Sequence, residues 1–179
     1  MLTKRSYQRH LPAGIRALLA ILILTQTGQV QAADPQAIEY HNGELTIALS
    51  AEVARAVDNG VPLTFISEYA VVTQILFFKI PRHIQSHQFV VTHHALSNRY
   101  LVSDGSDLAP NIFSSLTSTM DYVASSAMGL FNHYHSPETP YRMRLRLSKV
   151  DLPGPMRLSA FITEDWDINS GWKKWQSVP

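Results

Sequence analysis

The chain has 179 residues and no cysteine, which excludes a fold held together by disulfide bonds. Four of its 15 basic residues and none of its 14 acidic residues lie in the first 32 positions, so the remainder carries 11 basic against 14 acidic residues, a net charge of −3. That balance argues against a nucleic-acid-binding protein, which would show clustered excess basic charge.

The first 32 residues have the features of an export signal. Basic residues precede an apolar run over 17–24, and Val30 and Ala32 are residues that a signal peptidase accepts, so we expect cleavage after Ala32. An uncleaved anchor is the alternative, but the run is shorter than the roughly 20 residues needed to span a bilayer. We therefore predict a signal peptide at 1–32, a single globular domain at 33–179, a periplasmic location and no transmembrane segment after cleavage.

The mature chain begins with a predicted hairpin and a short helix. Strands are expected over 38–41 and 45–49, because Asn42-Gly43 between them is a strong signal for a tight turn. Ser50 is suited to cap a helix over about 50–59.

A long extended run follows from Val61 to Ile80. It is apolar at odd and at even positions, which predicts a central strand or two strands separated by a bend near Ala70. After a loop, the segment 88–104 predicts a second hairpin with its turn at Ser97-Asn98.

One long amphipathic helix is predicted over about 110–132. Pro110 suits its first turn. Apolar side chains recur at the spacing of one helical face: Ile112, Phe113, Leu116, Met120, Val123, Ala127, Leu130 and Phe131.

The last part of the chain predicts two more strands. Apolar and basic residues alternate from Tyr141 to Val150, and a Pro-Gly break at 152–155 separates that strand from another over 156–162. The predicted fold class is α+β: mainly an antiparallel β-sandwich or curled sheet, with the long helix and the short helix packed on it.

Five segments occur in an order that resembles a known family. They are GVPLTF at 60–65, THHALSNRYLV at 92–102, the apolar helix, LPGPMRL at 152–158 and W-x-I-x-S-x-W at 166–172. The set is similar to the uncharacterised proteobacterial envelope proteins grouped as domain of unknown function 4390. The resemblance implies a periplasmic setting and brings no catalytic residues.

Three arginines form the main candidate binding site. Arg142, Arg144 and Arg146 alternate along one predicted strand, so they form a basic stripe that Arg157 would widen. Arginine forks pair with carboxylate and phosphate groups. The alternative is a solvated sheet face neutralised by acids on neighbouring strands.

Histidines are the candidates for catalysis. A hydrolase could use His93 or His94 with Asp104 or Asp151, although the chain has none of the common catalytic motifs. Because neighbours on a strand point to opposite faces, the two histidines cannot bind one metal together.

Two further patterns suggest metal ligands. His133 and His135 could bind zinc with a distant third ligand, and Asp165, Asp167 and Asn169 match the first positions of a calcium loop whose glycine falls one place late. Surface and half-buried histidines explain the first pattern better than a zinc site, and a strand or turn with one solvent-exposed face explains the second better than a calcium loop, so we expect no metal and no cofactor.

These patterns favour a non-enzymatic binding or interaction module of the cell envelope over a hydrolase. The expected partner is an envelope protein, such as the outer domain of a membrane sensor, or an anionic envelope polymer.

Overall fold

The structure, a computed structural model, describes residues 37–106, 108–134 and 141–174, all within one compact unit of the chain, Asp34–Pro179. The predicted export signal and its cleavage point lie outside the described residues. Within the described ranges the fold is α+β with antiparallel sheets, as predicted. None of the helices in these ranges combines the length and the apolar character that crossing a bilayer requires.

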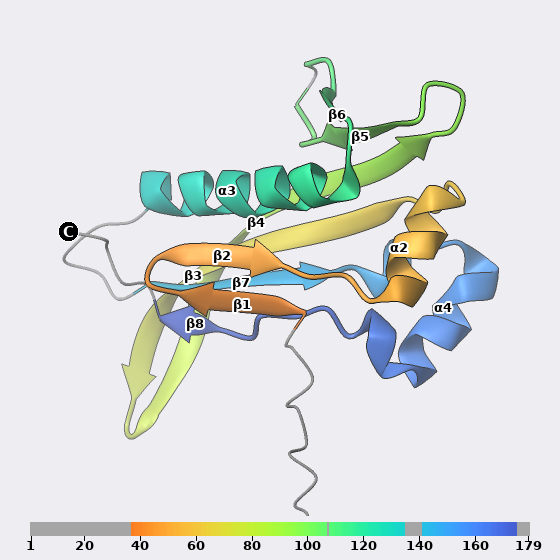
Figure 1. The fold of residues 1–179 in the computed structure, drawn as a ribbon. Helices are drawn as coiled ribbons and strands as arrows, with labels where there is room; N and C mark the ends of the chain where they lie inside the picture. Colours follow the sequence, from red (N-terminus) through yellow and green to blue (C-terminus); the bar gives the residue numbers. More distant parts are fainter. Residues whose placement is uncertain (1–36, 107, 135–140, 175–179) are drawn as a thin grey trace, which may run out of the picture. The chain divides into compact units, whose positions relative to one another are not determined.

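The centre of the fold is a long antiparallel hairpin (Figure 1). It belongs to a six-stranded sheet in the order β6-β5-β4-β3-β7-β8. The strands of this sheet are β3 (Leu63–Ile75), β4 (Phe78–His94), β5 (Arg99–Ser103), β6 (Asn111–Phe113), β7 (Tyr141–Leu147) and β8 (Lys173–Lys174). A separate two-stranded sheet pairs β1 (Ile38–His41) with β2 (Glu44–Ile47).

Helices and the small sheet bury one face of the large sheet. The helices are α2 (Ala51–Asp58), α3 (Leu116–Tyr134) and α4 (Gly154–Ile162), with short 3-10 turns η1 (Lys149–Asp151) and η2 (Glu164–Trp166). Alternate residues of β3, β4 and β7 join the buried stripe of α3 in a single hydrophobic core. Tyr69 of β3 and Phe131 of α3, for example, have ring centroids 6.2 Å apart. Each large side chain buried in this way contributes about 1.5–3 kcal/mol.

The first predicted turn and helix are confirmed. Asn42 and Gly43 both have positive φ, 50° and 85°, as a tight two-residue hairpin requires. The Ser50 hydroxyl accepts a hydrogen bond from the Val53 N–H at 3.3 Å and caps α2.

The predicted start of the long helix is wrong. The long helix begins at Leu116 and not near Pro110, because residues 111–113 pair with β5 as the edge strand β6. The Ser115 hydroxyl accepts a hydrogen bond from the Ser118 N–H at 3.2 Å, which gives the later helix start a polar cap.

The predicted strand over 156–162 is helix α4. Pro155 lies in its first turn, where proline is favoured because that position needs no intrahelical N–H donor.

The extended run over 61–80 contains a turn that the sequence did not predict. β3 ends at Ile75 and β4 starts at Phe78, so the chain reverses at Leu76-Phe77. Pro81 pairs with Val72 inside the hairpin. The bend expected near Ala70 corresponds to a β-bulge between Tyr69 and Val71.

Candidate functional site

The arginine row lies on one face of β7. Met143, Leu145 and Leu147 are buried, while Arg142, Arg144 and Arg146 point to the opposite face, as the alternation predicts. Arg157 is not on a strand. It lies in α4, where its Nε donates a hydrogen bond of 2.8 Å to the Leu152 carbonyl.

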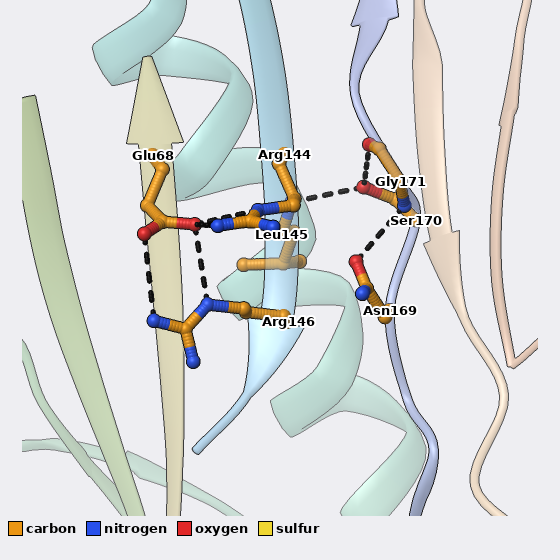
Figure 2. Close-up of polar contacts among 7 residues, drawn as sticks. All are labelled: Glu68, Arg144, Leu145, Arg146, Asn169, Ser170 and Gly171. Carbon is orange, nitrogen blue, oxygen red and sulfur yellow. Dashed lines mark hydrogen bonds and ion pairs between the residues drawn. The ribbon is translucent and has the colours of Figure 1, made fainter. Parts of the chain in front are cut away.

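Glu68 of the neighbouring strand β3 binds two of the three arginines (Figure 2). Its carboxylate accepts hydrogen bonds from Arg144 Nε at 2.7 Å and from Arg146 Nε at 3.2 Å and Nη2 at 3.4 Å. Arg144 Nη2 lies 2.6 Å from Glu68 Oε2. Since the Glu68 side chain is only 10% exposed, this cluster is held away from bulk water.

The segment after η2 lines the other side of β7. The Leu145 N–H donates to the Ser170 hydroxyl at 2.9 Å, and the Gly171 N–H donates to Asn169 Oδ1 at 2.9 Å. Gly171 has a φ of 63°, a conformation that favours glycine. This turn brings Trp172 under Arg144, with the guanidinium carbon 4.7 Å from the ring centroid.

The outer face around the row keeps an excess of positive charge. Lys174 of β8 pairs with Arg142 in the sheet, so among the described residues the three arginines of the row and Lys174 stand against one carboxylate, that of Glu68. Within the described ranges, no ion pair joins Arg142 or Lys174 to an acid. The neutralisation by cross-strand acids that the sequence left open is therefore local to Arg144 and Arg146.

His93 takes part in a polar cluster between α2 and the β4–β5 hairpin. Its Nδ1 lies 2.9 Å from the Asp58 carbonyl oxygen, and its Nε2 lies 3.2 Å from Asn98 Oδ1. Tyr100 packs on the imidazole ring and donates a hydrogen bond of 2.6 Å to the Asp58 carboxylate. That hydrogen bond, with burial and the nearby negative charge, raises the pKa of Tyr100 to about 12.

The hydrogen-bond partners of the two candidate histidines are therefore not the acids expected for a hydrolase. His94 Nδ1 lies 2.9 Å from the Ser97 hydroxyl in its own turn. The Ser106 hydroxyl and N–H donate hydrogen bonds to Asp104, which lower the pKa of that carboxyl.

Among the described residues, the predicted metal ligands do not converge. Over residues 37–106, 108–134 and 141–174, no three histidine or acidic side chains lie close enough together to hold an ion. Asp167 instead lies 3.5 Å from Lys149, and Asn169 is bonded to Gly171. His135 is outside the described residues.

A family model described as domain of unknown function DUF4390 matches residues 26–176. The chain belongs to this family. No curated protein and no solved structure matches the chain. The match covers the core, the arginine row and the polar cluster around His93, so all of them lie within the DUF4390 domain.

Sequence reasoning missed where the exposed apolar side chains of this DUF4390 chain lie. One group is the turn of the β3–β4 hairpin, Ile75 to Phe78, and the other is a face of α4 formed by Leu158, Phe161 and Ile162. The sequence signal at the turn was the run of four apolar residues from Ile75 to Phe78, which was assigned to a buried strand.

Proposed function

We propose that this DUF4390 domain is a non-enzymatic binding module of the bacterial cell envelope, exported to the periplasm. Its partner presents carboxylate or phosphate groups to the outer face of β7. The observation that carries the proposal is the positive excess around the arginine row, where Arg142 and Lys174 have no acidic partner among the described residues.

The geometry suits an anionic ligand better than a catalytic step. Glu68 fixes the guanidinium groups of Arg144 and Arg146, so these two side chains are already ordered before a ligand arrives. Arg142, which has no acidic partner among the described residues, then offers a fork that can bind a planar anion through two parallel hydrogen bonds. By contrast, both ring nitrogens of His93 already face oxygen atoms of the protein, which does not favour a general base.

The features of the first 32 residues support the location. A basic segment, an apolar run and a small-residue cleavage point are typical of export across the inner membrane. Outside that membrane, carboxylate-bearing cell-wall polymer is an abundant ligand of the required chemistry.

The test is co-sedimentation of the purified protein with lipid-free peptidoglycan sacculi. The informative variant is Arg142→Gln with Lys174→Gln, which leaves the Glu68 cluster intact. Its matched control, Arg55→Gln with Arg99→Gln, removes the same charge from exposed positions elsewhere. We expect the wild type and the control to sediment and the first variant to lose at least about tenfold in affinity, as for a lost charge-assisted contact.

A second arm of the same experiment covers a protein partner. Immobilised wild type and both variants are incubated with detergent-solubilised envelope proteins, and bound proteins are identified by mass spectrometry. If neither sacculi nor any envelope protein distinguishes the row variant from its matched control, the proposal is wrong.

A further inference from the structure

The β3–β4 hairpin extends beyond the rest of the sheet as a two-stranded arm (Figure 1). Pairing of β3 with β7 ends at Val71, whereas pairing of β3 with β4 continues to Ile75 and Phe78. On the other side, β5 pairs with β4 only over Val90 to His94. Four residues of each strand beyond Val71 give the arm a length of about 14 Å at 3.4 Å per residue.

The tip of this arm is apolar and exposed. Ile75, Leu76, Phe77 and Phe78 are consecutive, and their exposed fractions are 43%, 79%, 95% and 70%. Ile80 and Ile84 extend the apolar surface along β4, with 37% and 52% exposed. Contiguous exposed apolar side chains mark a surface that another molecule covers.

The turn itself is built from residues that folding alone does not favour. Leu76 has a φ of 55°, a left-handed conformation that glycine or asparagine adopts more readily than leucine. Neither burial in the core nor turn propensity accounts for apolar residues here.

The charge of the arm indicates the sign of the charge that a partner surface would carry. From Val71 to Arg82, the residues of the arm and its base, the sequence contains no Asp or Glu and two basic residues, Lys79 and Arg82. Arg82 pairs with Val71 at the base of the arm and is exposed. Basic residues in the strands next to an apolar tip complement a surface of anionic headgroups.

We infer that the hairpin tip inserts into the outer layer of an anionic lipid membrane. The tip is convex and carries the rings of Phe77 and Phe78. Fluid lipid can surround such a tip without a preformed pocket, and phenylalanine is favoured in that environment. Interfacial segments are buried by about 5–10 Å, so an arm of about 14 Å can place the tip among the headgroups and acyl chains while the sheet stays in water. This inference is independent of the arginine row, which lies on β7.

The test uses a reporter at the tip. Phe77→Trp is introduced into the full-length gene, and the protein is purified in the form that the cell produces. The tryptophan fluorescence of this variant is measured with phosphatidylglycerol vesicles whose acyl chains are brominated. The matched control is Leu96→Trp, because Leu96 is 96% exposed and lies in the turn at the other end of β4, about 50 Å away along the strand. The reporter position separates insertion of the arm from any attachment by the first 32 residues.

We expect a blue shift and quenching for Phe77→Trp and neither for Leu96→Trp. Quenching should be weaker with uncharged phosphatidylcholine vesicles. Absence of quenching at position 77, equal quenching at both positions, or equal quenching in both vesicle types would overturn the inference.

A second variant measures what the rings contribute. Phe77→Ser with Phe78→Ser changes two exposed side chains, so the fold and its unfolding transition should be retained. Vesicle affinity should fall about tenfold for each ring removed. An unchanged vesicle affinity in this folded variant would also overturn the inference.

Discussion

Replacing Glu68 by glutamine should destabilise the protein more than an ordinary surface substitution. Glu68 is a largely buried carboxylate that neutralises Arg144 and Arg146. The two arginines alternate on β7, so their charges lie about 7 Å apart, and at an effective dielectric constant of 20 their repulsion is about 2 kcal/mol. Because their side chains are 25% and 32% exposed, we halve this figure for solvent screening.

Loss of the charge-assisted hydrogen bonds adds a comparable amount. Glutamine keeps one acceptor oxygen and places an amide donor beside a guanidinium group, so at least one strong hydrogen bond is lost, worth about 1.5 kcal/mol. We therefore expect Glu68→Gln to lower the free energy of unfolding by about 2–3 kcal/mol. In a domain of this size that lowers Tm by about 6–10 °C.

Urea unfolding followed by circular dichroism at low salt measures this change. Glu39→Gln is the matched control, since Glu39 is exposed and should change stability by less than about 0.5 kcal/mol. Removing Arg144 as well should relieve the repulsion, so Glu68→Gln with Arg144→Gln should cost at least about 1 kcal/mol less than the sum of the single changes. Additivity to within about 0.5 kcal/mol would refute the claim that these residues act as one electrostatic cluster.

Three further outcomes follow from other parts of the fold. Tyr100 should titrate with a pKa of about 12 when followed by absorbance at 295 nm, and Asp58→Asn should lower that pKa toward 10. Because the folded state holds the Tyr100 proton more tightly than the unfolded state, this contribution to stability is present below pH 10 and is lost as the pH rises from 10 to 12. Phe131→Ala should lower the free energy of unfolding by about 3–5 kcal/mol in urea, and a cost under about 1 kcal/mol would contradict its place in the core. Leu76→Gly should raise the free energy of unfolding by about 0.5 kcal/mol, because glycine removes the left-handed strain while adding chain entropy; a loss of stability would show that the turn is not strained.

The sequence predicted elements whose causes are local. The tight turn at Asn42-Gly43 depends on two residues that tolerate positive φ, and helix α2 depends on the Ser50 cap and a short apolar stripe. The outward direction of the arginine row follows from the two-residue period of a strand. Each of these is decided within about ten residues of chain.

Features decided by distant pairing could not be predicted in the same way. Glu68 binds arginines that are 76 and 78 residues away, so its role depends on the order of β3 and β7 in the sheet. The reversal at Leu76-Phe77 lacks the usual turn residues, and its pairing across β3 and β4 overrides that local preference. Helix α4 is a different case: its cause is local, because Pro155 in the first turn favours a helix, and the apolar residues of 156–162 were wrongly assigned to a strand.

The most direct test of the proposed binding surface is photo-crosslinking in living cells. Ser86 is exposed on β4 and pairs with Glu68 of the neighbouring strand β3. A photoreactive amino acid at this position reports on the outer face of the sheet without removing a charge. Thr117, exposed on α3, is the control position. We predict an adduct from position 86, absent from position 117, in a chain that has lost its first 32 residues and fractionates with the periplasm. No adduct at position 86, or a chain that stays in the cytosol with its leader intact, would contradict the account.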